Sequence, residues 1–353
     1  MKKNQSEGEL RKTDLCLTVF IIGLFAVITV VAGVKLGSVK INFIDALKII
    51  IGKIFGFDLD SFVSSDVVIL WNMRMPRMLL ALAVGGGLAI GGCAMQALTQ
   101  NILADPYILG VSSGASAMVT GAFLIFGTSA AAGIIIPSFA FVGALLSMVL
   151  VYSLGMNGSV ESTNRLVLTG MAVSVVLNAM SHFILTMLPN AYIMTSAAMW
   201  MWGSLASARW GNIAFPMTIS FVIMITFSIM GNRFNLLSLG EETAITLGMN
   251  IRRMRRFIIV SVSVLVGTLI SSSGLIGFVG FIIPHTVRMI FGADHRKLFV
   301  LSFIAGGIFL GWMDILSRTI LAPREFSVGI FSAFFGGPFF IYLIYRQNKY
   351  KRL

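Results

Sequence analysis

The sequence contains ten apolar segments, and this pattern restricts the fold more than any other feature. Most of the segments have about the 20 residues that an α-helix needs to cross the hydrocarbon core of a bilayer. Backbone groups in hydrocarbon must be hydrogen-bonded within the protein, and these segments lack the alternation of barrel strands. We therefore predict an all-α polytopic membrane protein with about ten transmembrane helices. The expected spans are roughly 15–34, 70–99, 107–127, 134–154, 165–188, 209–230, 257–272, 275–292, 298–319 and 327–346.

The composition leaves little room for a separate soluble domain. Hydrophobic residues make up 57% of the chain and charged residues only 11%, whereas a soluble domain of this length carries far more polar surface. We therefore treat residues 1–353 as one transmembrane domain.

The basic residues predict how the chain is oriented in the membrane. An even number of spans puts both termini on one side, and roughly two thirds of the 26 Lys and Arg residues fall on that side. The positive-inside rule then predicts cytoplasmic N- and C-termini. The net charge of +12 is distributed over short loops, so it indicates membrane orientation and no nucleic-acid partner.

Two connecting segments are more than simple turns. The outer loop between the first two spans, residues 35–66, is long enough for a short amphipathic helix. The inner loop, about 231–256, contains Glu241 and Glu242, which favour a helix N-terminus, and Gly248, which ends that helix. Glycine pairs inside the spans, Gly87–Gly91 and Gly307–Gly311, predict close helix packing.

Charged residues near the outer ends of the spans need partners. Asp314 and Arg318 are four residues apart, so they share a helix face and can pair. Arg74 and Arg77 flank Pro76 on the predicted outer side. Either they snorkel to the interface, or they meet an acidic partner on the outer face.

Two other functions are alternatives to transport that a separate chain drives. An ATP-independent secondary transporter needs a coupling carboxylate within the membrane, and Asp314 is the candidate. An intramembrane serine protease would pair Ser112 or Ser113 of "GVSSG" with His182 or His285, although the nucleophile elbow needs a strand-to-helix turn. The sequence has no ATP-binding P-loop and no metal-spaced Cys/His cluster. We predict no catalytic residue and no metal site.

The stretch from Gly274 to Lys297 combines glycines with Pro284, His285 and Arg288. Its glycines predict close helix packing or a re-entrant turn at the outer end. Pro284 is expected to break or kink the span, and His285 to bond to backbone that the proline frees. Arg288 is expected at the cytoplasmic rim, where it can snorkel.

Three spaced motifs resemble a known family. Residues 74–116 contain R-M-P-R, then G-C-A-M-Q and N-I-L-A-D-P-Y-I-L-G; residues 237–250 read "LSLGEETAITLGMN"; residues 273–296 contain P-H-T-V-R and then D-H-R. They are similar to motifs of the permease subunits of binding-protein-dependent ABC importers for iron-siderophores, haem and cobalamin. One departure is Ile102, where the family usually has proline.

The resemblance implies a ten-helix subunit in the cell membrane of a prokaryote. Its expected partners are a second permease copy or a close homologue, two cytoplasmic ATPase subunits and an extracytoplasmic substrate-binding protein. The substrate would be a metal chelate, with an iron(III)-siderophore expected and haem or cobalamin as alternatives. ATP and Mg would belong to the ATPase, so no cofactor is expected in this chain.

The resemblance also implies roles for single residues, carried over by their place in the motifs. The implied binding-protein docking residues are Arg74, Arg77 and Arg318. The implied ATPase coupling residues are Leu239, Gly240, Glu241, Glu242, Ala244, Leu247 and Gly248. The implied cytoplasmic gate consists of Asn101, Leu103, Thr163 and Asn164.

Overall fold

The computed structural model describes residues 20–37, 39, 41–58, 62–127, 129, 133–156 and 163–350. Within these residues the chain is helical and contains no strand. The first expected span, 15–34, is therefore described only from residue 20, as the helix Phe20–Lys35.

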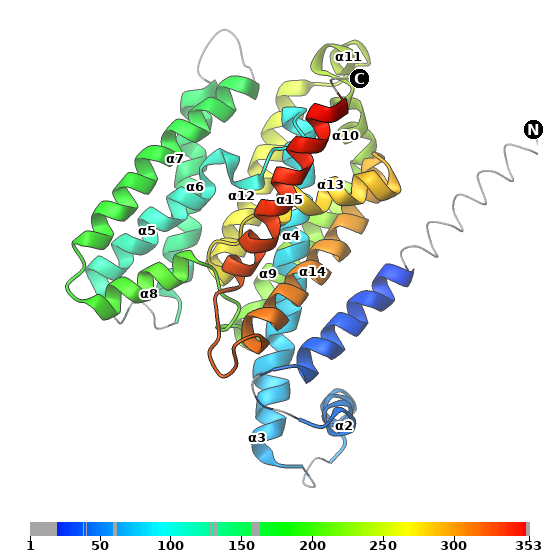
Figure 1. Cartoon of the computed structure of the whole chain (residues 1–353). Helices are drawn as coiled ribbons and strands as arrows, with labels where there is room; N and C mark the ends of the chain where they lie inside the picture. Colours follow the sequence, from blue (N-terminus) through cyan, green and yellow to red (C-terminus); the bar gives the residue numbers. More distant parts are fainter. Residues whose placement is uncertain are drawn as a thin grey trace, which may run out of the picture.

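Two groups of helices make up the bundle. In Figure 1, α4 runs through the centre of one group, among α9, α12, α13, α14 and α15, while α5 to α8 form the second group beside it. Helix α12 packs against α6 and α5, and so joins the two groups. The helices are α2 (Phe43–Phe55), α3 (Ser64–Val67), the π-helix η1 (Val68–Arg74), α4 (Met75–Thr99), the 3₁₀ turn η2 (Pro106–Leu109), α5 (Val111–Phe126), α6 (Ile135–Met156), α7 (Thr163–Thr186), α8 (Ala191–Met201), α9 (Trp210–Ile229), α10 (Gly231–Ser238), α11 (Glu241–Thr246), α12 (Ile251–Ser273), α13 (Val279–Phe291), α14 (His295–Thr319) and α15 (Val328–Tyr350).

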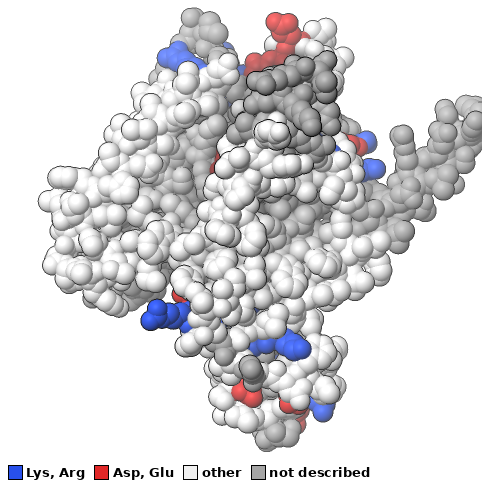
Figure 2. Space-filling view, viewed as in Figure 1, with Lys and Arg blue, Asp and Glu red and all other residues white. Residues whose placement is uncertain are grey.

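Each of the ten expected spans coincides with a helix. By length and composition, six helices of the described chain are able to cross a membrane, and four shorter apolar helices occupy the remaining positions. Figure 2 shows charged side chains toward the two ends of the molecule and an almost uncharged surface between them. The predicted all-α, multi-pass membrane fold is confirmed.

Besides α10 and α11 of the inner loop, two helices lie outside the spans. The amphipathic helix expected in the first outer loop is α2, which begins after the N-cap Asn42 and ends at Gly56 in the left-handed conformation. Helix α8 was not predicted: its 11 residues are too few for a span, and they begin at the N-cap Asn190. The two ends of the bundle are named after their short helices. The α2 end holds α2 and α3, and the α11 end holds α10, α11 and the end of α15 (Figure 1).

Glycine lets α4 approach its neighbours closely, as predicted. The closest backbone contacts, however, are made by glycines near the predicted GxxxG pairs and not by the pairs themselves. A Cβ atom on Gly85 would overlap the carbonyl oxygen of Gly306 in α14, and the reverse also holds. Gly92 meets the Gly280 carbonyl of α13 in the same way. Of the GxxxG residues, Gly91 has room for a Cβ, whereas Gly87 does not. Backbone contact of this kind fixes the spacing between membrane helices.

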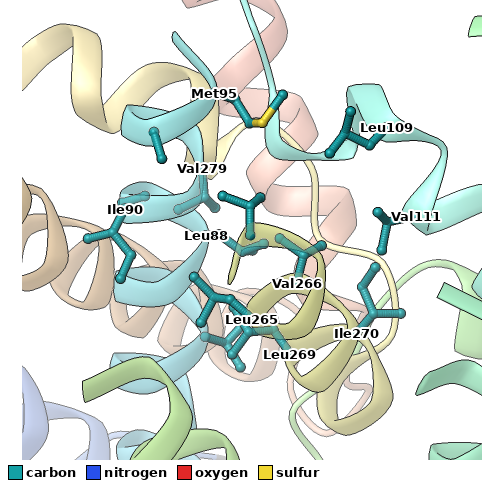
Figure 3. Close-up of a cluster of buried hydrophobic side chains, with 14 of the residues drawn as sticks. Leu88, Ile90, Met95, Leu109, Val111, Leu265, Val266, Leu269, Ile270 and Val279 are labelled. Carbon is teal, nitrogen blue, oxygen red and sulfur yellow. The ribbon is translucent and has the colours of Figure 1, made fainter. Parts of the chain in front are cut away.

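Side chains from both groups complete the core around α4. Figure 3 shows apolar side chains of α4 and α12 interlocking with the turn before α5 and the start of α13. The labelled residues are Leu88, Ile90, Met95, Leu109, Val111, Leu265, Val266, Leu269, Ile270 and Val279.

Pro76 explains the π-helix that precedes α4. Proline lacks an N–H, and its ring crowds the carbonyl four residues earlier. The chain widens to the π form over Val68–Arg74 directly before this proline. The helix continues without a break from Ser64 to Thr99, so Arg74 and Arg77 both lie on one long helix.

Of the two outcomes expected at Pro284, a break is wrong, and a kink stays a prediction. Helix α13 runs uninterrupted through this buried proline. The interruption lies earlier, at residues 274–278, where Gly274 and Phe278 have positive φ angles of 66° and 70°. The glycine-rich start of this stretch therefore forms the turn, and Gly280 gives the close packing.

Candidate functional site

A cluster of four charged side chains lies at the α2 end. Arg77 of α4 donates from Nε to Asp314 Oδ1 at 2.7 Å and from Nη1 to Glu325 Oε2 at 2.8 Å. Arg318 Nε lies 3.2 Å from Asp314 Oδ2, an ion pair without hydrogen-bond geometry. Asp314 is fully buried, whereas the Glu325 side chain is 40% exposed. These four residues are called the α2-end cluster below.

Two arginines hold the end of the helix Phe20–Lys35. Arg74 donates from Nη1 to the carbonyl oxygens of Val34 and Lys35, at 2.8 and 3.0 Å, and from Nη2 to that of Val39 at 2.6 Å. Arg318 Nη2 reaches the Gly33 carbonyl at 2.5 Å. The last carbonyls of a helix lack helical partners and carry partial negative charge, so guanidinium groups stabilise them.

These contacts bear on the predictions for the outer arginines. The pairing of Asp314 with Arg318 is confirmed, but the shorter contact of Asp314 is with Arg77, which sequence spacing does not reveal. The sequence reasoning also missed Glu325. Docking by Arg74, Arg77 and Arg318 stays a prediction. All three side chains are buried and occupied within the chain, so an external carboxylate would have to displace an internal partner.

At the α11 end, α10 is attached to the start of α14. Asn235 Oδ1 accepts from the backbone N–H of His295 at 2.8 Å, and its Nδ2 donates to Asp294 Oδ1 at 2.9 Å. Hydrogen bonds from Arg296 hold the pKa of Asp294 well below its usual range. A Cβ atom on Gly231 would crowd the Arg296 backbone. The D-H-R motif, 294–296, thus fastens α10 to α14.

Helix α11 begins and ends as predicted. It starts at Glu241, and Gly248, with φ 84°, follows its last turn. Ala244, on the inner face of this helix, is fully buried. The remaining coupling residues lie on its surface: Leu239, Glu242, Leu247 and Gly248 are exposed, and Gly240 and Glu241 are half-buried.

Glu241 makes the side-chain contacts that tie α11 to its neighbours. Its Oε1 accepts from Arg255 Nη2 of α12 at 2.6 Å and from Thr163 Oγ1 of α7 at 3.0 Å. Thr163 is one of the predicted gate residues, and Asn164, the next one, is exposed. The structure thus joins a predicted coupling residue to a predicted gate residue.

The other half of the predicted gate lies in the turn after α4. Asn101 Oδ1 accepts from the N–H of Leu103 at 2.9 Å, and Leu103 packs against Phe281 and Ile282 of α13. Among the described residues, no hydrogen bond joins this turn to Thr163 or Asn164. The preceding residue, Gln100, donates to the Leu237 carbonyl of α10 at 3.2 Å. Both gate halves therefore contact the segment that contains α10 and α11.

The same turn is anchored on its other side. Asp105 accepts from the N–H of Tyr107 at 2.8 Å, and burial raises the pKa of Asp105 to about 6. The Tyr107 hydroxyl donates to the Ile276 carbonyl at 3.0 Å and accepts from the Ile276 N–H at 3.2 Å. This tyrosine links the turn to the non-helical stretch before α13.

The contacts also bear on the residues of the other two hypotheses. Asp314 lies between two arginines and is not open to a coupling ion. Ser113 lies within α5, and its hydroxyl donates to the Gly110 carbonyl at 2.8 Å. No group of three metal-ligating His, Cys, Asp or Glu side chains occurs among the described residues. The hydrogen bond predicted for His285 stays a prediction.

A comparison with models of protein families identifies the family of this chain. The FecCD transport family matches residues 24–346. The chain belongs to the FecCD transport family. Its relatives include permease proteins of a hemin transport system, an Fe(3+)-citrate import system and a cobalamin import system. The sequence resemblance is confirmed.

Relatives and solved structures agree with this placement. The FecCD chain is 34% identical to the uncharacterized ABC transporter permease protein YvrB of Bacillus subtilis (strain 168), over 94% of each chain. It is 35% identical to the hemin transport system permease protein HmuU of Yersinia pestis, over 79% of this chain and 83% of HmuU. A metal-chelate type ABC transporter in an inward-facing conformation matches with a TM-score of 0.79 and 27% identity. That match covers 94% of this FecCD chain and 99% of the other.

Proposed function

We propose that this chain is the permease subunit of an ATP-driven importer, which carries an iron(III)-siderophore-type chelate from an extracytoplasmic binding protein into a prokaryotic cytoplasm. It would act with a second permease copy or a close homologue and with two ATPase subunits. The α11 end, and with it both termini, would face the cytoplasm. The bias of Lys and Arg toward that side of the predicted topology supports this orientation.

The observation that carries the proposal is an apolar surface at the α11 end. Leu239, Ile245 and Leu247 are 64%, 59% and 58% exposed. Ile245 lies in α11, Leu247 directly follows α11, and Leu239 directly follows α10, so none of the three belongs to a membrane span. Apolar side chains exposed to water mark a protein-binding surface. These three residues are called the α11 patch below, and we assign the partner ATPase as its occupant.

The names of the relatives support an iron chelate as the cargo. Relatives named for Fe(3+)-citrate and iron(3+)-hydroxamate import match over 99% and 96% of this chain at 32% and 31% identity, and the hemin and cobalamin permeases match at 35% over 79% and 78%. Hemin and cobalamin systems belong to the same family, so the alternatives are haem and cobalamin.

Gate and docking roles complete the proposal. Asn101, Leu103, Thr163 and Asn164 would narrow the cytoplasmic end of the path between two permease copies. At the α2 end, Arg77 would receive an acidic residue of the binding protein in place of Glu325, whose exposed carboxylate already occupies its guanidinium. Arg74 and Arg318 would support this surface by holding the helix Phe20–Lys35.

Assembly tests the ATPase surface. Leu247→Glu places a charge in the α11 patch, and we expect the tagged permease to lose copurifying ATPase by at least about tenfold, since one charge on an apolar interface opposes burial. Leu247→Met keeps an apolar side chain and should retain the ATPase. Equal ATPase recovery with Leu247→Glu would contradict the assignment of this surface.

A competition experiment tests which chelate the permease transports. Cells that express the permease with its binding protein and ATPase would be given a ⁵⁵Fe(III)-trihydroxamate chelate, with unlabelled haem or cobalamin in excess. We expect ⁵⁵Fe uptake that neither competitor reduces. Uptake of labelled haem or cobalamin, without ⁵⁵Fe uptake, would replace the iron chelate by that cargo.

A further inference from the structure

We propose that Glu241 is the bridge through which movement of α11 reaches the gate at the start of α7, with Arg255 as its anchor. The inference rests on the proposed function, because it assumes that a partner ATPase moves α11. It assigns Glu241 a mechanical role inside the permease, separate from contact with that ATPase.

One carboxylate oxygen joins three elements. Glu241 Oε1 accepts from Arg255 Nη2 at 2.6 Å and from Thr163 Oγ1 at 3.0 Å. The three residues lie in α11, α12 and α7, which are separated by turns and by long stretches of chain. A displacement of α11 must therefore stretch one of these bonds or carry the first residue of α7 with it.

Burial of Arg255 calls for an acidic partner. The Arg255 side chain is only 3% exposed, so its charge is costly without a carboxylate beside it. Glu241 lies in the first turn of α11, where the dipole favours an anion. A charge-assisted hydrogen bond is stronger than a neutral one. Arg255 thus holds Glu241 in place, and Glu241 presents its oxygen to Thr163.

The neighbouring helix α10 does not offer the same route. It is fastened to α14 through Asn235, Asp294 and His295, and its Leu237 carbonyl accepts from Gln100 after α4. These contacts hold the α4 side of the predicted gate to the rigid part of the bundle. Glu241 reaches the other side, at Thr163, so a movement of α11 changes the spacing between the two gate halves.

The role is that of a positioning residue, so its test needs a measurement that simple loss of structure does not change. We choose the number of chelate molecules transported per ATP hydrolysed. The complete complex of permease, ATPase and binding protein would be reconstituted in proteoliposomes, with a ⁵⁵Fe(III)-trihydroxamate chelate as the probe. Copurification of the ATPase and the unfolding temperature of each variant show whether the complex is intact.

Two variants break the bridge from opposite sides. Glu241→Ala removes the shared oxygen, and Thr163→Val removes only the hydroxyl while keeping the side-chain shape. Because Oε1 accepts two hydrogen bonds, one of them from a charged group, we expect Glu241→Ala to lower the transport ratio about tenfold or more. Thr163→Val should lower it several-fold, and Thr163→Ser, which keeps the hydroxyl, should restore it. ATP hydrolysis should continue in all of them.

A matched control lies on the same helix as Thr163. The Thr169 hydroxyl donates to the Arg165 carbonyl within α7 at 2.8 Å and takes no part in the bridge. Thr169→Val is therefore expected to keep the ratio of the unmodified protein.

The outcomes separate the bridge from the proposed function. If the wild-type complex transports without a working ATPase, the proposed function fails. If wild-type transport needs the ATPase but Glu241→Ala and Thr163→Val keep a normal ratio, the bridge is wrong and the proposed function stands. Should Glu241→Ala fail to assemble, the pair Thr163→Val and Thr163→Ser decides, since neither touches the charge on Arg255.

Discussion

The two ends of the bundle each hold arginine–carboxylate pairs, but the pairs differ in what they connect. In the α2-end cluster, Arg77 and Asp314 join α4 to α14, two helices that pack closely along their length, and Asp314 is fully buried. At the α11 end, Arg255 joins the long helix α12 to Glu241 on a helix of six residues, and Glu241 is 34% exposed. Similar chemistry therefore joins two closely packed helices at one end and, at the other, a long helix and a short one that we propose moves.

The difference shows why an ion pair alone does not identify a functional site. Removing one partner from a fully buried pair leaves an uncompensated charge and destabilises the protein strongly. In the Glu241–Arg255 pair only the carboxylate is partly exposed, so we expect a smaller contribution to stability than at the α2 end, and we propose that the pair also transmits movement. The predictions below test this contrast one variant at a time.

Asp314→Ala removes the carboxylate between Arg77 and Arg318. We expect a loss of about 3–5 kcal/mol in the free energy of unfolding, because two guanidiniums remain buried near each other. Thermal unfolding of the purified protein in detergent measures it. Glu325→Gln changes the exposed member of the same cluster and should shift unfolding far less. An unchanged unfolding temperature for Asp314→Ala would show that the α2 end is not locked by its charges.

Gly92→Ala tests the close packing between α4 and α13. The new Cβ would overlap the Gly280 carbonyl oxygen, and we expect a destabilisation of about 1–3 kcal/mol from the forced shift of α13. The control is Gly121→Ala in α5, where a Cβ meets nothing within 4 Å. Similar unfolding temperatures for the two variants would contradict the close α4–α13 contact.

Glu241→Gln gives the contrast at the α11 end. It removes the charge that faces buried Arg255 but keeps an oxygen that can accept from it, so we expect a smaller stability loss than for Asp314→Ala. Transport per ATP should nevertheless fall. A large fall in unfolding temperature, with transport per ATP unchanged, would make this pair a structural lock like the α2-end cluster.

The last prediction concerns a pH dependence in the gate turn. The folded pKa of Asp105, about 6, lies above the usual value near 3.9 because of burial. The protonated form is therefore favoured in the folded state. The stability that it contributes is fully present below pH 4 and is lost as the pH rises through about 6.

Asp105→Asn mimics the protonated group, so it should raise the unfolding temperature at pH 7 but not at pH 4. Unfolding curves at both values, with the unmodified protein beside the variant, measure this. The same shift at both pH values would show that the Asp105 charge is not the cause.

Much of the fold follows from the sequence because membrane helices are long and their apolar pattern is strong. The ten spans, the helix in the outer loop and the start of α11 at Glu241 were all predictable from residue type. Helix α8 was missed because 11 residues form no span. The break was assigned to Pro284, whereas the chain leaves the helix at Gly274. A buried proline inside a packed helix is tolerated when neighbouring groups take the freed backbone positions.

The contacts of the site were harder to predict because they join distant positions. The i, i+4 spacing revealed Asp314 and Arg318, but nothing local indicates that Arg77 lies nearer or that Glu325 completes the α2-end cluster. The motif resemblance selected Glu241 and Thr163 for separate roles, coupling and gating. Their hydrogen bond, between residues 78 positions apart, appears only in the folded chain.

The most direct test of the account is ATP-driven uptake in proteoliposomes that contain the permease, its ATPase and the binding protein. One preparation carries the normal ATPase and the other an ATPase whose P-loop lysine is replaced. The account predicts ⁵⁵Fe(III)-chelate accumulation with the normal ATPase and none with the replaced one, whether or not a proton gradient is present. Accumulation that persists with the replaced ATPase and collapses when the proton gradient is dissipated would contradict it.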